Sequence, residues 1–189
     1  MILSSSHPVR LETPRLLLRE LRLDDWPDAR AIDSDPEVVR FQSNDVVDEA
    51  GSRAYLAEAE RLARESPRQV YDLAITEPGD DRLLGRVGLR IRRPEHREAE
   101  LWFTLRRDRW GTGLASEAAA GLLDLAFGPL GLHRVYGDCD PRNHRSARLM
   151  EKLGLRREAH LRQNWWLKGE WCDSLLYAIL EEEWRPGRK

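Results

Sequence analysis

The residues most suggestive of chemistry are two glycines, Gly111 and Gly113, which follow a run rich in arginine. Before them, residues 98–105 alternate between polar and apolar side chains, which is the period of a β-strand. After them, apolar residues recur at spacings of three and four, as in a helix, until Gly128 and Pro129. A glycine turn from a strand into a helix leaves backbone N–H groups free at the positive end of the helix dipole. The stretch therefore predicts an anion site, with a phosphate as its natural occupant.

Two common phosphate-binding motifs do not describe this turn. A P-loop has Lys followed by Ser or Thr after its last glycine, and here Leu114 and Ala115 follow instead. The dinucleotide-binding fingerprint has three glycines at fixed spacing, which this turn lacks. The hypothesis of a nucleotide-binding domain is therefore disfavoured.

The six residues from Trp110 to Ala115, Trp-Gly-Thr-Gly-Leu-Ala, resemble the pyrophosphate loop of the GNAT superfamily of acyl-CoA-dependent N-acetyltransferases. The family pattern is Gln/Arg-x-x-Gly-x-Gly/Ala. Tryptophan departs from it at the first place, but Trp-Gly-x-Gly-x-Ala-x-Glu-Ala is familiar in the branch that acetylates ribosomal-protein N-termini. The resemblance implies acetyl-CoA as co-substrate. The loop residues that it assigns to coenzyme binding are Trp110, Gly111, Thr112, Gly113, Leu114 and Ala115.

A second block, Asp140 to Gly154, resembles the family pattern Asp-Pro-x-Asn-x-x-Ser-x-x-Leu/Met-x-x-Lys-Leu-Gly. In the family the asparagine contacts the pantetheine arm and the serine lies near the thioester, which implies these roles for Asn143 and Ser146. Without the resemblance, a helix cap for Asn143 and an ordinary first-turn serine for Ser146 are the preferred interpretations. The family also pairs strand backbone groups with pantetheine, which here implies Phe103, Thr104 and Leu105.

Glu100 is the candidate general base, because the family branch often has Glu-Ile-Gly-Tyr where this chain has Glu100-Leu-Trp-Phe103. The alternative is a solvated strand carboxylate beside Glu98. Trp102 stands where the family usually has glycine, and an indole on the Glu100 face is expected to narrow the acceptor side. An acyl-cysteine on Cys139 is disfavoured, because no histidine is placed beside it and the family transfers the acetyl group directly.

The elements that must position these residues follow from periodicity and turn signals. We expect one α/β (α+β) domain over residues 1–189, with a mixed, mostly antiparallel GNAT-like sheet and helices on both faces. Residues 1–10 are a loose lead-in and residues 11–184 the core. The predicted strands are 15–22, 69–76, 83–91, 98–105, 133–138, 158–167 and 170–180; the predicted helices are 24–34, 38–41, 48–65, 116–128 and 143–153.

Composition narrows the class of protein. A chain of 189 residues suits one domain, and a net charge of −2 disfavours a nucleic-acid partner. The two cysteines, Cys139 and Cys172, have no metal-ligand spacing, so we expect no metal. No apolar run approaches the ~18 residues of a membrane span, so we expect a cytoplasmic protein without a membrane partner. Either a monomer or a homodimer is compatible with the sequence.

Charge is divided unevenly along the chain. From Asp24 to Glu60 there are eleven acidic residues and three arginines, whereas from Arg142 to Arg157 there are six basic residues and one acid. If the acidic segment borders the acceptor entrance, it favours a cationic amine. The leading hypothesis is acetyl transfer to a protein or peptide N-terminal α-amine. The alternative functions are acetylation of a small cationic amine (a polyamine or aminoglycoside) and non-catalytic regulation by acyl-CoA binding. The alternative explanation of the acidic segment is that its carboxylates serve only as helix caps and solvated faces.

Overall fold

The computed structural model describes residues 8–184, and within them the chain forms one eight-stranded sheet. Its order is β1-β2-β3-β4-β5-β6-β8-β7, and every neighbouring pair is antiparallel except β5 and β6. This confirms the mixed, mostly antiparallel sheet. The strands are β1 (Arg10–Glu12), β2 (Leu17–Glu20), β3 (Val70–Glu77), β4 (Asp80–Arg93), β5 (Glu98–Leu105), β6 (Arg134–Cys139), β7 (Arg156–Leu167) and β8 (Glu170–Leu180).

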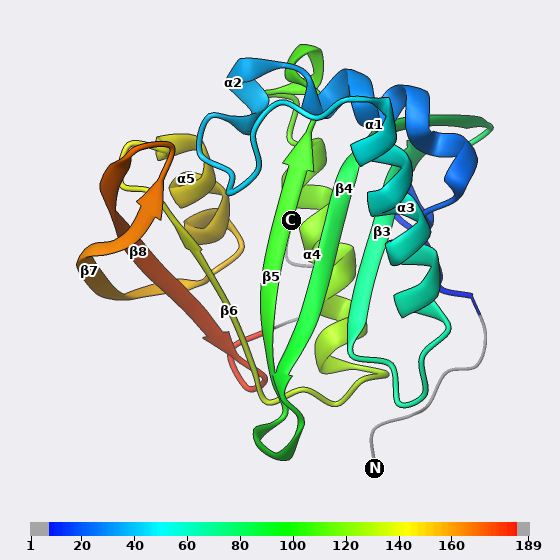
Figure 1. The fold of residues 1–189 in the computed structure, drawn as a ribbon. Helices are drawn as coiled ribbons and strands as arrows, with labels where there is room; N and C mark the ends of the chain where they lie inside the picture. Colours follow the sequence, from blue (N-terminus) through cyan, green and yellow to red (C-terminus); the bar gives the residue numbers. More distant parts are fainter. Residues whose placement is uncertain (1–7, 185–189) are drawn as a thin grey trace.

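Helices cover both faces of the sheet, as predicted. In Figure 1, α1 (Trp26–Asp33) and α3 (Glu49–Ala63) lie in front of β3 and β4, and α4 (Leu114–Phe127) lies behind them. The short α2 (Pro36–Val39) stands above the end of β5, and α5 (His144–Lys152) packs against β6, β7 and β8. The sheet is therefore the middle layer of three.

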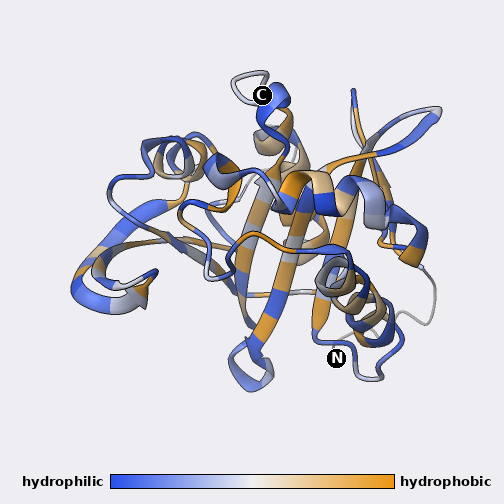
Figure 2. Ribbon diagram, turned by 45° about the horizontal axis from the view of Figure 1, so that its top comes forward, coloured by the Kyte–Doolittle hydropathy of each residue, from blue (hydrophilic) through white to orange (hydrophobic). Residues whose placement is uncertain are grey.

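The main core lies between the sheet and α4, whose buried stripe is spaced by three and four residues. Leu122 and Leu123 are fully buried, as are Ala119 and Ala126. Burying each leucine stabilises the fold by about 1.5–3 kcal/mol. Figure 2 shows the same pattern, with hydrophobic colour along the sheet and the inner helix faces and hydrophilic colour at the loops.

The opposite layer contains a buried polar cluster under α1 and α3. Arg86 on β4 donates to Asp33 of α1 at 2.6 Å, and its guanidinium lies 4.4 Å from the ring centroid of Tyr55 on α3. The Tyr55 hydroxyl donates to Asp72 on β3. Burial raises the pKa of both Asp33 and Asp72, and the Arg86 charge opposes this rise.

The predicted elements agree with the structure in number and type from residue 24 onward, and β5 has the predicted limits. The first predicted strand, 15–22, is shorter: β2 spans only the four residues that pair with β3, and three of them also pair with β1, a three-residue strand that was not predicted. Residues 1–7 of the predicted lead-in lie outside the described residues. Val9 is buried and Arg10 begins β1, so the end of that segment belongs to the fold.

The feature that creates the site is the separation of β5 from β6. The two parallel strands pair over only three positions, ending at Glu100 and Tyr136. Beyond these residues the strands diverge, as Figure 1 shows toward the end that α2 covers. The N-termini of α4 and α5 follow these two strands, so the topology brings both predicted coenzyme motifs to the gap.

Candidate active site

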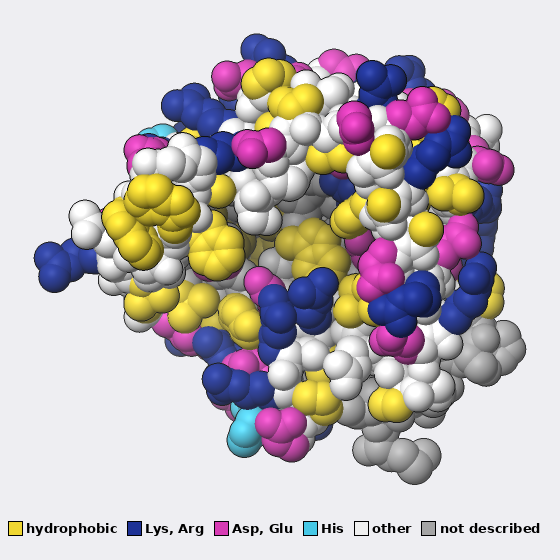
Figure 3. Space-filling view, viewed as in Figure 1, with side chains coloured by type: hydrophobic (Ala, Val, Ile, Leu, Met, Phe, Trp, Pro, Cys, Tyr) yellow, Lys and Arg dark blue, Asp and Glu magenta, His cyan; other side chains and the backbone are white. Residues whose placement is uncertain are grey.

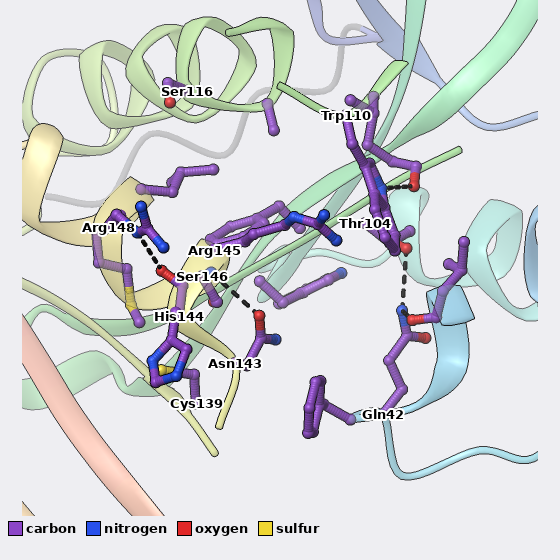
Figure 4. A pocket seen from close by; sticks show the side chains of 18 of the residues that line it. Gln42, Thr104, Trp110, Ser116, Cys139, Asn143, His144, Arg145, Ser146 and Arg148 are labelled. Atoms are coloured by element: carbon purple, nitrogen blue, oxygen red, sulfur yellow. Dashed lines mark hydrogen bonds between the residues drawn. The ribbon is translucent and has the colours of Figure 1, made fainter. Parts of the chain in front are cut away.

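A cavity of about 880 Å³ occupies the gap between β5 and β6. Its walls are β5, the residues after α2, the N-terminus of α4 and the face of α5 (Figure 4). Figure 3 shows a hollow at the centre of this side of the molecule, with hydrophobic side chains on its floor. The cavity brings together every residue that the sequence assigned to the site except Thr112. They are Glu100, Phe103, Thr104, Leu105, Trp110, Gly111, Gly113, Leu114, Ala115, Asn143 and Ser146.

The N-terminus of α4 opens into this cavity without a side-chain cap. Gly111 and Gly113 have φ values of 77° and 82°, a conformation that glycine adopts without strain. The first helical hydrogen bond here runs from Glu117 N–H to Gly113 C=O. Within residues 8–184, the N–H groups of Leu114, Ala115 and Ser116 have no hydrogen-bond partner. Free donors at the positive end of a helix dipole form an anion site.

Arg15, from the N-terminal part of the chain, holds the loop of residues 110–115 in place through hydrogen bonds. Arg15 donates to the Glu117 carboxylate from its backbone N–H and from Nε, at 2.7 and 2.6 Å. Its Nη1 also donates to the Thr112 carbonyl at 3.0 Å. Burial alone would raise the pKa of Glu117, but the bonds from Thr13 and Arg15 lower it overall. Arg15 therefore ties the loop to β2.

Two loop residues use their side chains within the protein. The Trp110 indole N–H donates to the Leu105 carbonyl at 2.8 Å, which fixes the loop against the end of β5. The Thr112 hydroxyl donates to the Arg109 carbonyl at 2.6 Å, and this residue does not line the cavity. On the cavity side of Trp110, the Arg145 guanidinium lies 4.7 Å from the ring centroid.

The start of α5 supplies the opposite wall. Asn143 caps the helix, because its Oδ1 accepts from the Ser146 N–H at 3.2 Å (Figure 4). The Ser146 hydroxyl is hydrogen-bonded to the thiol of Cys139. Burial, together with the charge of Asp138, raises the pKa of Cys139 to about 11. At neutral pH this thiol is protonated and a weak nucleophile, in agreement with the preference for direct transfer.

Glu100 lies on the other side of the gap and is half-buried. Its Oε2 accepts from Arg92 Nε on β4 at 2.6 Å. A second carboxylate, Asp138 on β6, also lines the cavity. Sequence reasoning missed Asp138; the available signal was the alternation along residues 134–139, which places it on the same face as Tyr136. Partial desolvation raises the pKa of Asp138, and repulsion by Glu100 raises it further.

The Trp102 side chain differs from the expectation that it narrows the acceptor side. Trp102 pairs across strands with Gly88 of β4. A Cβ atom at Gly88 would lie 2.1 Å from Trp102 Cζ2, so the indole covers the bare backbone of Gly88. The bulk of the ring thus lies over β4, on the side of β5 remote from β6. Its edge still contributes to the cavity wall.

A further missed residue, Gln42, follows α2. Its Nε2 donates to the Thr104 hydroxyl at 3.0 Å and to the Val38 carbonyl at 3.2 Å. It joins the segment after α2 to the end of β5, the strand portion assigned to pantetheine. No local sequence signal marks this glutamine, because its partner is 62 residues away.

The acidic segment is mostly occupied by internal partners. Of its eleven acids, nine accept a hydrogen bond or form an ion pair, and only Asp24 and Glu37 lack one among the described residues. The nine are Asp25, Asp28, Asp33, Asp35, Asp45, Asp48, Glu49, Glu58 and Glu60. Glu37 is the member of the segment that lines the cavity. Helix caps and surface pairs therefore account for most of these residues, which favours the alternative over a strong negative field at the entrance.

The basic segment behaves differently. Arg142 is paired with Asp140 and Glu170, and Arg156 with Glu183. Arg145, Arg148 and Lys152 line the cavity and have no ion pair within residues 8–184. These three cations and the free N–H groups of α4 face the same space, which suits a ligand with several phosphates.

Between residues 8 and 184, no group of three or more His, Cys, Asp or Glu side chains is arranged to hold a metal ion. No helix in that range has the length and apolar character needed to cross a membrane.

Comparison with known proteins gives a consistent family. Residues 15–156 match the model of the acetyltransferase (GNAT) domain. An uncharacterized N-acetyltransferase of Bacillus subtilis, YnaD, is 32% identical over 93% of this chain and 99% of its own length. A solved GNAT-family acetyltransferase from Bacillus anthracis aligns with a TM-score of 0.83 and 29% identity, covering 93% of this chain and all of that one.

Two relatives with stated acceptors match smaller parts. The [ribosomal protein uS5]-alanine N-acetyltransferase of Escherichia coli is 31% identical over 42% of each chain. The spermidine N(1)-acetyltransferase of the same organism is 27% identical over 50% of each chain. Since the two acceptors differ, these matches do not choose between them. The loop, the parted strands and the family match together lead to one conclusion: the chain belongs to the GNAT family of acetyltransferases and is an N-acetyltransferase.

Proposed function

We propose that this N-acetyltransferase transfers the acetyl group of acetyl-CoA directly to the N-terminal α-amine of a protein or peptide. The observation that carries the coenzyme part is the uncapped N-terminus of α4, whose free N–H groups open into the gap between β5 and β6. The pyrophosphate lies on these donors, near Arg145. The pantetheine arm runs between Asn143 and residues 103–105 of β5.

The groups that remain free support this placement. The edge of β5 beyond Glu100 has no strand partner on the β6 side, so its backbone groups are available to an amide-containing ligand, except the Leu105 carbonyl, which accepts from Trp110. Ser146 lies on the α5 wall and can protonate the departing thiolate, alone or through water. Alignment of the thioester against the amine supplies the largest part of the rate enhancement.

An α-amine is favoured over a polyamine by the charges at the cavity. A polyamine is best held by several free carboxylates. Of the four acids that line the cavity, Glu100 and Asp140 are each bound to an arginine, which leaves only Glu37 and Asp138 without an ion pair among the described residues. The protonation cost points the same way. At pH 7, losing a proton costs an α-amine of pKa ~8 roughly 1.4 kcal/mol, whereas a lysine-like amine of pKa ~10.4 costs roughly 4.6 kcal/mol.

The test is an acceptor comparison that detects the free thiol of coenzyme A and locates the acetyl group by mass spectrometry. The set contains an alanine-initiated peptide, the same peptide with a blocked N-terminus and one internal lysine, and spermidine. We expect transfer to the free α-amine and at least tenfold lower kcat/KM, a difference of about 1.4 kcal/mol, for the other two. Preferred acetylation of spermidine or of the lysine would contradict the proposed acceptor.

Flanking charge provides a second readout. Because the acids of residues 24–60 are occupied, peptides with basic and acidic flanks should differ by less than about threefold at ordinary ionic strength. A large preference for basic flanks that fades with salt would restore the hypothesis of an acidic entrance.

A further inference from the structure

Two carboxylates face the cavity from neighbouring strands. Glu100 is the last residue of β5 that pairs with β6, opposite Tyr136. Asp138 lies two residues after Tyr136 on β6, beyond the last position where β5 and β6 pair. Gly137, between them, still lies against the Leu101 carbonyl of β5, and Asp138 lines the cavity. A group at this point is the first on β6 to face the open gap.

The partners of the two carboxylates differ. Glu100 Oε2 accepts from Arg92 Nε at 2.6 Å, and a second guanidinium nitrogen of the same arginine is also within ion-pair distance. Its negative charge is therefore partly balanced, and this oxygen is occupied. Asp138 has no ion pair among the described residues, and its side-chain partner is the neutral hydroxyl of Ser174 on β8.

The other groups around Asp138 are consistent with a proton acceptor. On its own strand, Cys139 is protonated at neutral pH and is bonded to Ser146 of α5. From β5, the charge of Glu100 acts together with desolvation to raise the pKa of Asp138, and the bond from Ser174 opposes the rise. A carboxylate with a raised pKa is a stronger base than an ordinary one.

We propose that Asp138 accepts the proton that the amine acceptor loses, and that Glu100, fixed by Arg92, is a positioning residue. The acceptor arrives as an ammonium ion, and one N–H proton passes to the Asp138 carboxylate. The freed lone pair forms a C–N bond with the thioester carbon, and the C–S bond then breaks. The second N–H proton goes to the thiolate through Ser146 or water. The product is the amide with free coenzyme A thiol, and Asp138 releases its proton to solvent.

This inference rests on the proposed function, and its test is the pH dependence of kcat/KM for an α-amine peptide in four proteins: wild type, Asp138→Asn, Glu100→Gln and Ser174→Ala. Two breaks are expected for wild type: a lower one on the acidic side, where Asp138 ionises, and a higher one, above which kcat/KM falls because the free acceptor is no longer an ammonium ion. Asp138→Asn removes the lower break and reduces kcat/KM about a hundredfold near neutral pH. Calorimetric titration with coenzyme A should show unchanged affinity in every variant.

The other two variants test the assignment without removing the carboxylate. Glu100→Gln keeps the lower break but moves it to lower pH, because the charge that raises the pKa of Asp138 is gone. Ser174→Ala moves the break to higher pH, because the bond that stabilises the charged form is lost. A merely structural role for Asp138 would reduce the rate in Asp138→Asn and leave the break in place.

The outcomes separate the two proposals. If wild type releases no thiol with any amine offered, the proposed function fails. If wild type is active and the lower break disappears in Glu100→Gln but persists in Asp138→Asn, the base is Glu100 and this inference is overturned.

Discussion

The two sides of the cavity are built from segments with opposite charge. On one side, α5 presents Arg145, Arg148 and Lys152, none of which has an ion pair within residues 8–184. On the other, nine of the eleven acids in residues 24–60 are bound by arginines, a lysine, helix N-termini or loop N–H groups. Counting charges along the chain treats both segments alike. Among the described residues, the basic segment keeps three unpaired cations at the cavity and the acidic segment keeps one unpaired acid there, Glu37, because free charge depends on what each side chain already contacts.

The largest expected effect is on stability, and it follows from removing Arg86, the arginine that pairs with a buried acid on the acidic side. Arg86→Met leaves Asp33 and Asp72 buried without their cation, and we expect a loss of about 3–5 kcal/mol in the free energy of unfolding at pH 7. Urea denaturation measures this loss. The matched control is Arg82→Met, where an exposed arginine lies 3.7 Å from Asp28 and its removal should cost less than about 1 kcal/mol.

The same variant should depend on pH in a defined direction. Burial already raises the pKa of Asp33 and Asp72, and removal of Arg86 raises both values further. A carboxyl with a raised folded-state pKa contributes stability below its ordinary pKa and loses it as pH rises through the folded-state value. The loss caused by Arg86→Met should therefore be smaller near pH ~4.5 than near pH ~7. A loss that grows toward acid would show that the two carboxyls are not the partners that matter.

The second effect concerns the coenzyme side and its free N–H groups. In Gly113→Val, a β-branched residue must occupy a φ of 82° at the entrance to α4, which disturbs the anion site. We expect affinity for acetyl-CoA to fall at least tenfold, about 1.4 kcal/mol, in calorimetric titration.

Gly131→Val is the control for this effect. It imposes a similar strain, at a φ of 57°, in the turn that follows the opposite end of α4. Stability should fall in both variants but affinity only in the first. Equal affinity in the two would remove the loop from the binding site.

The smallest expected effect tests whether arginines without an ion pair contribute more to acetyl-CoA binding than arginines that already have one. Arg145→Ala removes a cavity-lining cation that has no ion pair, and the Michaelis constant for acetyl-CoA should rise about three- to tenfold, less at high salt. Arg142→Ala removes an arginine that lines the same wall but is bound to Asp140 and Glu170, so its effect should be smaller. The reverse order of the two effects would mean that internal pairing does not decide which cations hold the coenzyme.

The sequence predicts those features that local pattern determines. Residues 98–105 alternate strictly and form β5 as predicted, and glycines at 111 and 113 mark the turn because few other residues adopt their conformation. The two family motifs also lie on the same cavity, as the resemblance implied. These parts depend on neighbours within one or two turns of the chain.

The parts that the sequence did not predict depend on distant partners. Asp138 is the next-to-last residue of a short strand, and alternation gives only its face; its place at the open gap follows from the three-residue pairing of β5 with β6. Gln42 and Thr104 meet only because α2 stands over the end of β5. The strand β1 has three residues and no periodicity to detect, since it is held by pairing with β2.

The contact between Gly88 and Trp102 limits the order in which these two residues can be substituted during evolution. A side chain at position 88 needs the volume that the indole fills, since its Cβ would lie within 2.1–2.7 Å of three indole atoms. Trp102 must therefore be replaced by a smaller residue before Gly88 can be replaced by a larger one. The protein that carries only the first substitution has a cavity beside the acceptor wall. Substitution in the opposite order forces backbone or ring displacement. The residues at positions 88 and 102 are therefore expected to change together. A tryptophan can replace a glycine at position 102 only in a chain that already has glycine at position 88.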